Sequence, residues 1–284
     1  YEVAYDCFRN GFCRMNESVP ILEAKDLEKT FESRSLFRRT KRVKALDRVN
    51  FKIHRGEVVA IIGESGSGKT TLGKALCRLM SVDSGTVNFF GKDLFAMNTS
   101  ELRSARRTFQ MLFQNQSANL HPKMTMGEML DESLRLHRPE LGAEERREHA
   151  TELADRVGLK ERMDQRPASM SGGEKRRAGL ARILATKPEV IVADEPTSGL
   201  DAAIKLQIID LLKSLKEESL SYVIISHDLG LVRRIADRIL VMLHGEVIEE
   251  FSAACWSEGA EHHPYTERLI KASLLDRDDR ASNG

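Results

Sequence analysis

Cysteine is scarce in this sequence, and its few positions form no recognisable metal or disulfide pattern. The 284-residue chain has four cysteines, which are Cys7, Cys13, Cys77 and Cys255. Their spacing matches no paired C-x-x-C zinc pattern, and so few cysteines in a chain of this length argue against a disulfide framework. We therefore expect reduced thiols in a cytoplasmic protein, with a redox pair of Cys7 and Cys13 as the less favoured alternative.

Long apolar runs are also missing. No stretch approaches the roughly 18 apolar residues that a membrane-spanning helix needs. Residues 1–16 carry Asp6 and Arg9 where a signal peptide needs an unbroken apolar core. The sequence thus predicts neither a transmembrane helix nor a signal peptide, and any membrane role must come through a partner.

An excess of charge of one sign is absent as well. Lysine and arginine total 44, and aspartate and glutamate total 43. Because nucleic-acid-binding proteins usually carry a basic excess, this balance argues against a nucleic-acid partner. We interpret the basic run at residues 38–42 as a solvated loop, with a contact to phospholipid headgroups as the alternative.

The sequence does contain several short, continuous apolar runs. Three of them, Val58–Ile62, Val190–Ala193 and Tyr222–Ile225, are typical of strands covered on both faces. Helical patterns at residues 71–80, 175–186 and 203–216 lie between or after these runs. This alternation predicts an α/β fold with a mainly parallel sheet.

Other segments predict smaller parts of the fold. The first fifty residues and the segment at 86–90 have the pattern of short strands, which favours an antiparallel β subdomain. The polar, helix-favouring residues 115–168 predict a helical insertion. A hairpin is expected at 239–248, around a turn at 244–246, and the pattern weakens into a tail after Phe251.

A phosphate-binding loop is the strongest single signal. The loop matches G-x-x-x-x-G-K-[ST] and consists of Gly63, Glu64, Ser65, Gly66, Ser67, Gly68, Lys69 and Thr70. Glycines let the backbone curl so that N–H groups point at phosphate oxygens, and the helix that begins near Thr70 and Thr71 adds partial positive charge. Lys69 supplies a full charge, and the Thr70 hydroxyl suits Mg²⁺. We therefore expect ATP and Mg²⁺ here, rather than a plain glycine-rich turn.

An acidic pair follows the second buried run. Asp194 and Glu195 stand at the carboxyl end of that predicted strand, where ligands bind in open α/β sheets. We assign Asp194 to Mg²⁺ and Glu195 to the attacking water, because phosphoryl transfer needs one group that orients the nucleophile. His227 follows the third strand and is placed near the γ-phosphate. Taken alone, the acids could equally cap a helix, and the histidine could be structural.

The segment Ser171–Glu174 resembles the signature of ABC ATPases, usually written Leu-Ser-Gly-Gly-Gln, and the order of all the motifs matches that family over about residues 21–273. The resemblance implies a P-loop NTPase with a RecA-like parallel core, an antiparallel β subdomain and a helical signature subdomain. It divides the chain into an N-terminal extension (1–20), a nucleotide-binding domain (21–251, with the helical subdomain at about 115–168) and a C-terminal extension (252–284).

The resemblance also implies further site residues. Gln114 resembles the Q-loop glutamine, which contacts Mg²⁺ and senses the γ-phosphate, and His227 resembles the switch histidine. Residues 198–201 resemble the D-loop. Phe31 resembles the aromatic residue that stacks on adenine, with Phe37 as the less favoured choice. The acidic pair corresponds to the Walker B aspartate and the catalytic glutamate.

In this family the signature faces the ATP of a second subunit. Ser171, Gly172 and Gly173 precede a predicted helix, and a helix N-terminus preceded by glycines is a second anion site. The resemblance thus implies a head-to-tail dimer with a homologous or identical ATPase subunit. Met170 replaces the usual leucine with little change in volume, whereas Glu174 replaces glutamine and adds a charge whose effect on the signature stays open.

Two segments narrow the type of ABC protein. Residues 114–122 and 262–270 resemble those of dipeptide, oligopeptide and nickel importers. This implies an ATP-hydrolysing subunit on the cytoplasmic face of the membrane, with permease subunits and, indirectly, a solute-binding protein as partners. The alternatives are a non-transport ABC ATPase, such as a subunit of a phosphonate-processing complex, and an unrelated P-loop kinase. The simpler interpretation of the tail is a surface helix starting near Pro264, and its single Cys255 predicts no iron–sulfur cluster.

Overall fold

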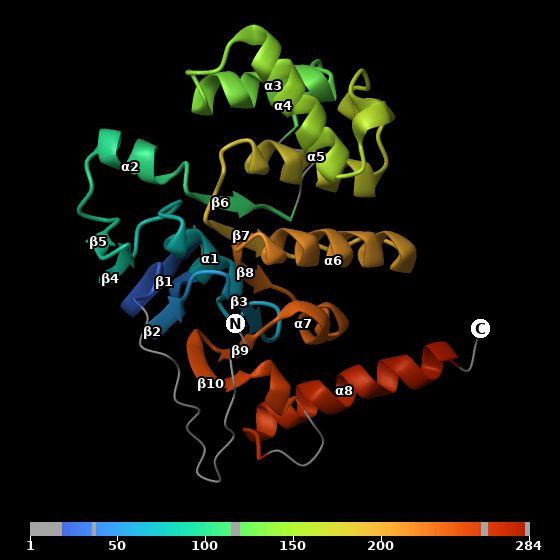
Figure 1. The fold of residues 1–284 in the computed structure, drawn as a ribbon. Helices are drawn as coiled ribbons and strands as arrows, with labels where there is room; N and C mark the ends of the chain where they lie inside the picture. The colour runs from blue at the N-terminus through green and yellow to red at the C-terminus, as the bar shows by residue number, and fades with distance from the viewer. Residues whose placement is uncertain (1–18, 36–37, 115–119, 257–260, 282–284) are drawn as a thin grey trace.

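The computed structural model describes residues 19–35, 38–114, 120–256 and 261–281 (Figure 1). Several predictions fall outside these ranges: most of the N-terminal extension, Cys7 and Cys13, Phe37, and residues 115–119 of the importer-like stretch.

Two sheets form the framework of the molecule. The strands are β1 (Leu22–Ser35), β2 (Arg38–Ile53), β3 (Val58–Ile62), β4 (Ser84–Phe89), β5 (Lys92–Asp93), β6 (Phe109–Leu112), β7 (Val190–Asp194), β8 (Ser221–Ile225), β9 (Arg238–Leu243) and β10 (Glu246–Ser252). One sheet has the order β2-β1-β4-β5, and its pairs are antiparallel. The other has the order β10-β9-β3-β8-β7-β6 and is parallel except at β10. The predicted α/β fold is confirmed.

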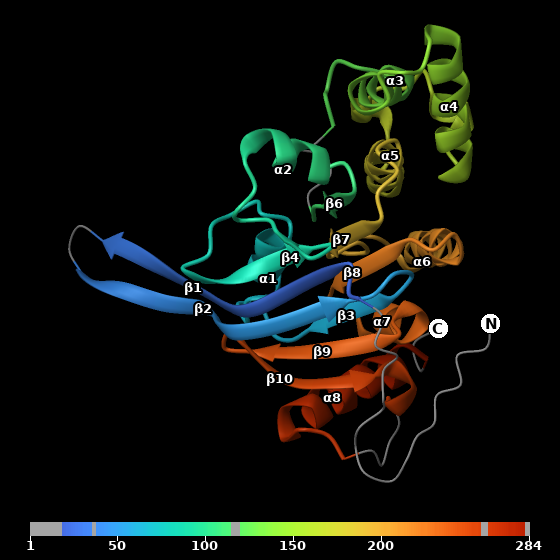
Figure 2. The ribbon, with the colours of Figure 1, turned by 60° about the vertical axis from the view of Figure 1, so that its left-hand side comes forward.

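The helices cover both faces of the parallel sheet. The α-helices are α1 (Lys69–Leu76), α2 (Thr99–Ala105), α3 (Met126–His137), α4 (Ala143–Arg156), α5 (Gly172–Leu184), α6 (Ala202–Glu217), α7 (Leu229–Ile235) and α8 (Pro264–Ala281). Short 3₁₀ turns are η2 (Lys160–Arg162), η3 (Pro167–Ser169) and η4 (Ala253–Cys255). Helices α3 and α4 stand apart from the sheet, beside α5, where a helical insertion is predicted (Figure 2).

Alternate strand residues point to opposite faces, so each face of the sheet packs against its own set of elements. Val59 and Ile61 join α1 and the antiparallel sheet in one cluster, whereas Ala60 and Ile62 join α7 and α8 in another. A third cluster joins β7 and β8 to α3, α4, α5 and α6. Such fully buried strands explain the unbroken apolar runs of the sequence.

The prediction of short N-terminal strands is wrong, since β1 has 14 residues and β2 has 16. The residues that resemble turn signals are bulges inside continuous strands. The register shifts between Ala24 and Leu27, where Asp26 has a φ of 47°, and again between Leu27 and Lys29, where Arg48 on the partner strand also has a φ of 47°. A bulge absorbs an extra residue and bends the strand without ending it.

The basic run at 38–42 is likewise a strand, not a loop, because it begins β2. Arg42 lies opposite Glu32 on β1, and Arg42 Nε is 2.8 Å from Glu32 Oε1. Cross-strand charge pairs of this kind are compatible with an exposed ribbon.

Two helices start earlier than predicted. α5 starts at Gly172 rather than Lys175, because Ser171 and Glu174 form a capping box across its first turn. α1 starts at Lys69 and ends at Leu76 rather than continuing to residue 80; Arg78, with a φ of 45°, breaks the helical path.

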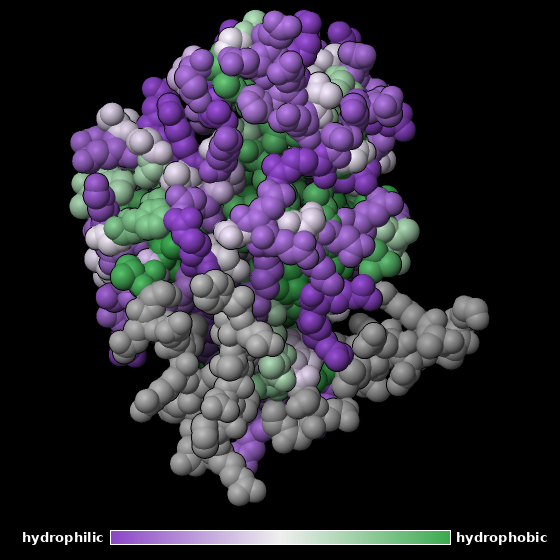
Figure 3. Space-filling model, in the orientation of Figure 1, coloured by the Kyte–Doolittle hydropathy of each residue, from purple (hydrophilic) through white to green (hydrophobic). Residues whose placement is uncertain are grey.

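The described helices include none with the length and apolar character to cross a bilayer. On the face shown in Figure 3, hydrophilic side chains cover most of the region of α3, α4 and α6.

Candidate nucleotide site

The loop Gly63–Thr70 connects β3 to α1 at the carboxyl end of the central strand. Two of its glycines are required by close packing as well as by backbone conformation. A Cβ on Gly63 (φ 147°) would lie 2.2 Å from the Met242 carbonyl oxygen, and one on Gly68 (φ 104°) would lie 2.3 Å from that of Ala45. No side chain fits at either position, so the loop is fixed in its curled path.

Lys69 begins α1 and folds back over this loop. Its ammonium donates to the carbonyl oxygens of Gly63 at 2.7 Å and Glu64 at 2.6 Å, and the residue is 8% exposed. Burial lowers the pKa of Lys69, while nearby carboxylates, Glu195 foremost, oppose the change. The charge is thus held among acceptors inside the loop.

Thr70 and Asp194 join the loop to the end of β7. The Thr70 hydroxyl donates to Asp194 Oδ1 at 3.2 Å, and Asp194 is 5% exposed. Burial raises the pKa of Asp194, and the hydrogen bond from Thr70 opposes the rise. A hydroxyl and a carboxylate in contact offer the hard oxygen ligands that Mg²⁺ prefers, so these residues fit the ion.

Gln114 lies close to the same edge of the sheet. It is exposed and follows β6, whose Leu112 pairs with Ala193 beside Asp194. The strand register therefore brings the predicted glutamine to the end of the sheet that carries the acidic pair.

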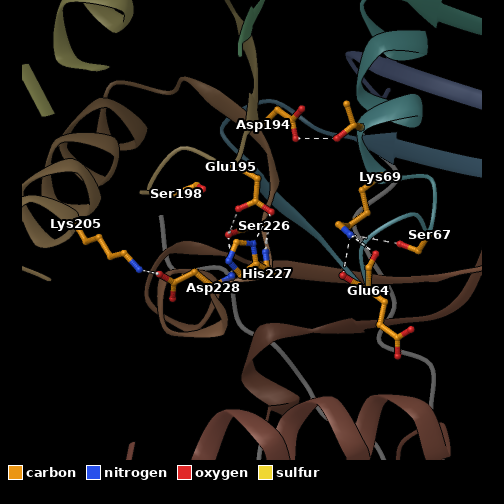
Figure 4. A network of polar contacts seen from close by, with 12 residues as sticks. Glu64, Ser67, Lys69, Asp194, Glu195, Ser198, Lys205, Ser226, His227 and Asp228 are labelled. Atoms are coloured by element: carbon orange, nitrogen blue, oxygen red, sulfur yellow. Dashed lines mark hydrogen bonds and ion pairs between the residues drawn. The ribbon is translucent and has the colours of Figure 1, made fainter. Parts of the chain in front are cut away.

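Glu195 turns sharply out of β7 and meets His227 (Figure 4). Its φ is 50°, a left-handed conformation that costs a non-glycine residue about 1 kcal/mol or more. Glu195 Oε1 lies 2.8 Å from His227 Nδ1 and accepts the His227 backbone N–H at 3.2 Å. Glu195 Oε2 has the longer contact, 3.5 Å to the Ser226 hydroxyl. The structure thus brings the predicted acid and histidine together.

Arg176 is a site residue that the sequence analysis missed. It lies on α5, is 6% exposed, and donates to the carbonyl oxygens of Glu195 at 2.7 Å and Ser198 at 3.1 Å. Burial lowers the pKa of Arg176, and Glu195 opposes the change. In the sequence it stands between Lys175 and Arg177, and nothing local distinguishes it from its charged neighbours.

The signature residues lie on another part of the surface. The Ser171 hydroxyl accepts the Glu174 N–H at 3.2 Å, and the packing neighbours of Gly172 and Gly173 are Leu200 and Ile204 near the start of α6. These contacts place the signature beside the predicted D-loop, rather than on the phosphate loop of the same chain. Ser171 and Gly172 are exposed.

Glu174, which replaces the usual glutamine of the signature, has two partners for its charge. Its carboxylate accepts the Ser171 backbone N–H at 2.8 Å and lies 3.0 Å from Arg162 Nε on η2. The backbone hydrogen bond from Ser171 lowers the pKa of Glu174, and Arg162 adds to this. The added charge is therefore used in capping and is balanced locally.

Phe31 is 44% exposed on β1, opposite Val43 on β2. The Lys29 ammonium lies 5.9 Å from the centre of its ring. The ring is accessible for stacking, and both of these neighbours belong to the antiparallel sheet.

Comparison with known proteins identifies the arrangement. A family model described as ABC transporter matches residues 46–198. The dipeptide transport ATP-binding protein DppF of Haemophilus influenzae is 40% identical over 263 residues, which cover 91% of this chain and 80% of the relative. The oligopeptide transport ATP-binding protein OppF of Escherichia coli (strain K12) is 37% identical over 271 residues, with 93% and 80% coverage.

A solved structure supports the same assignment. The dimeric, post-hydrolysis state of an ATP-binding cassette bound to ADP and Pi has a TM-score of 0.73 and 32% sequence identity, and the match covers 82% of this chain and 98% of that one. The chain therefore belongs to the ABC transporter family, as an ATP-hydrolysing subunit similar to those of dipeptide and oligopeptide transporters.

Proposed function

We propose that this chain hydrolyses Mg-ATP at the loop Gly63–Thr70 and thereby drives a peptide importer. One observation carries the assignment of the site: Lys69 at the start of α1 and the pair Asp194 and Glu195 at the end of β7 come from distant segments and gather at one end of the parallel sheet (Figure 4). Ligands of open α/β sheets bind at this end.

The loop and Lys69 would bind the phosphate groups of ATP. The loop carbonyls that now accept the ammonium hold it beside the N-terminus of α1, and both groups attract an anion. Ser65 and Gly66 would supply further backbone N–H groups, the Ser67 N–H donates within the loop to the Glu64 carbonyl oxygen at 3.2 Å, and Thr71 would extend the site into α1.

Thr70 and Asp194 would hold Mg²⁺, with Gln114 at the adjoining sheet edge. When bound, the ion neutralises charge on the β- and γ-phosphate oxygens.

Glu195 orients the attacking water and accepts its proton. His227 holds Oε1 through two contacts, which leaves Oε2 as the more available oxygen. Phosphoryl transfer depends mainly on positioning and charge stabilisation, and Arg176 fixes the backbone on which this carboxylate stands. His227 is 69% exposed at its side chain, so it can reach a phosphate oxygen at the mouth of the site.

The second ATP contact comes from a homologous or identical subunit. Ser171, Gly172 and Gly173 form a helix N-terminus at which Ser171 and Gly172 are exposed, and the neighbours of its glycines are Leu200 and Ile204 rather than the phosphate loop. In a head-to-tail pair they would close over the partner's nucleotide, and hydrolysis would separate the pair.

The cargo assignment rests on the relatives. DppF and OppF are transport ATP-binding proteins for dipeptides and oligopeptides, and they support an importer rather than the phosphonate-processing alternative. Nickel-like cargo is supported only by the resemblance of residues 114–122 and 262–270 to segments of dipeptide, oligopeptide and nickel importers. The chain would lie on the cytoplasmic face of the membrane, in contact with a permease. A solute-binding protein would deliver the cargo to that permease.

Substitution of Glu195 by glutamine tests the mechanism. Glu195→Gln keeps the shape of the side chain but removes its basicity, so we expect ATPase turnover to fall at least about a hundredfold while Mg-ATP still binds. The control is Glu189→Gln, at the opposite end of β7, where the carboxylate pairs with Arg55; it should leave turnover nearly unchanged. Normal turnover in Glu195→Gln would remove this residue from the role of base.

A further inference from the structure

The C-terminal helix reaches the phosphate loop. α8 begins at Pro264, which suits the first helical position because proline needs no hydrogen-bond acceptor there. The next residue, Tyr265, is 4% exposed, and its hydroxyl accepts the backbone N–H of Glu64 at 2.9 Å. The tail thus contacts the second residue of the loop, far away in the sequence.

Polar contacts fix the start of this helix. His262 Nδ1 lies 2.7 Å from Glu249 Oε1, and its Nε2 lies 3.2 Å from the Cys255 carbonyl oxygen. The other oxygen of Glu249 accepts the His263 N–H at 3.1 Å, and His263 Nδ1 accepts the Tyr265 N–H at 3.2 Å. These bonds tie the residues before Tyr265 to β10, and so they limit where its ring can lie.

Apolar packing adds to this anchor. Tyr265, Trp256 and Ile270 belong to one buried cluster with Ile62 and Val241 of the parallel sheet. Ile62 is the last residue of β3 and immediately precedes the loop. In Figure 1, α8 begins below β10 and extends past α7, which it contacts.

The hydrogen bond acts on the same peptide group that holds Lys69. A trans peptide group is planar, and its C=O and N–H point in opposite directions. In the peptide group between Gly63 and Glu64, the carbonyl oxygen accepts the Lys69 ammonium at 2.7 Å and the N–H donates to Tyr265 at 2.9 Å. Fixing the N–H on the side of α8 therefore orients the carbonyl toward the lysine.

We propose that Tyr265 is a positioning residue of the nucleotide site, through which the C-terminal helix orients the Gly63–Glu64 peptide group and with it Lys69. The proposal rests on the assignment of Gly63–Thr70 as the phosphate loop. It gives the C-terminal extension a role in ATP binding within the chain, independent of any partner.

Removal of the hydroxyl alone is the test. Tyr265→Phe keeps the ring that packs beside Trp256, so the fold should persist. One hydrogen bond contributes about 0.5–1.5 kcal/mol, which corresponds to a factor of about two to ten in a binding constant. We expect the Kd for Mg-ADP, measured by calorimetry on the full chain, and the KM for ATP to rise by that factor, with kcat changed much less. Amide hydrogen exchange at Glu64 should become faster.

Tyr222→Phe is the matched control. Its hydroxyl is also buried but has no hydrogen-bond partner among the described residues, so its removal should leave the Kd unchanged.

Lys69→Ala separates the two proposals. If Lys69→Ala retains normal affinity, the phosphate-loop assignment fails. If Lys69→Ala loses binding while Tyr265→Phe keeps the wild-type Kd, KM and Glu64 exchange rate, the role of Tyr265 alone is overturned.

Discussion

At the scale of single residues, the site concentrates charge in places that disfavour it. Lys69, Asp194 and Arg176 are each less than one-tenth exposed. Burial favours the neutral form of each, because it lowers the pKa of Lys69 and Arg176 and raises that of Asp194. Glu195 adds backbone strain, with its φ of 50°. Functional sites commonly hold such costs, which the surrounding fold must offset.

Asp194 provides the clearest test of this cost. Its pKa is raised in the folded protein, so the folded state binds this proton more tightly than the unfolded state does. Protonation of Asp194 at low pH therefore adds to the free energy of unfolding, and this contribution is lost as the pH rises through the folded pKa. At neutral pH the charged carboxylate therefore destabilises the nucleotide-free protein. We expect Asp194→Asn to raise the free energy of unfolding at neutral pH, with a gain that shrinks as the pH is lowered.

Denaturant unfolding without nucleotide or Mg²⁺, in neutral and in mildly acidic buffer, measures this effect. The exposed Asp210 on α6 provides a control, Asp210→Asn, that should change stability little at either pH. Lower stability of Asp194→Asn at neutral pH would show that the carboxylate helps to hold the free protein together.

At the scale of elements, α5 links two parts of the proposed mechanism. Its first turn carries the signature, capped by Ser171, and one turn later Arg176 supports the backbone of Glu195 and Ser198. A rigid helix transmits a displacement of its N-terminus along its length. Contact of the signature with a partner's nucleotide would thus affect the position of Glu195, the proposed catalytic carboxylate.

Arg176→Met removes the guanidinium donors and the charge but keeps an unbranched apolar side chain, which is shorter than that of arginine. Loss of a charged hydrogen-bond donor costs about 1.5–3 kcal/mol, so we expect a lower free energy of unfolding. Because the Glu195 backbone loses its support, we also expect roughly a tenfold lower kcat, a factor that corresponds to about 1.4 kcal/mol in the barrier. The Kd for nucleotide should be unchanged. Arg177→Met, at the neighbour that donates to Gln207, is the control and should keep its kcat. An equal loss in both variants would point to general damage to α5.

At the scale of the whole molecule, the proposed function involves more than one chain. The described helices include none able to span a bilayer, and the proposed second half of the site faces outward on α5. The proposed function adds a second ATPase subunit and a permease, as the similarity to transport ATP-binding proteins and to a dimeric cassette supports. The exposed helices α3 and α4, beside α5, are the surface we propose for contact with the permease (Figure 1).

Purification of the tagged chain from detergent-solubilised membranes of its natural cell tests this arrangement. We expect a polytopic membrane protein and a second ATP-binding chain, identical or homologous, to co-purify. The Glu195→Gln form with Mg-ATP should retain the second chain more firmly, because the closed pair is not released by hydrolysis. Recovery with soluble proteins alone would favour a non-transport ABC ATPase.

Much of the core of the site follows from the sequence, because the required signals are local. An apolar run, a glycine-rich loop with Lys69 and an acidic pair after a second run each report on the few residues they contain. Parallel strands then place their carboxyl ends at one edge of the sheet. The phosphate loop, Asp194, Glu195 and His227 could therefore be grouped before any coordinates were considered.

The remaining features depend on register between distant segments. Only the tertiary structure shows that Asp26 and Arg48 form bulges within long strands, that Arg176 faces inward toward Glu195, and that Tyr265 meets Glu64. The sequence by itself determined the chemistry of the site, because that chemistry lies in contiguous motifs. The structure decided which residues support those motifs, because burial and hydrogen bonding are set by packing between elements that no local pattern records.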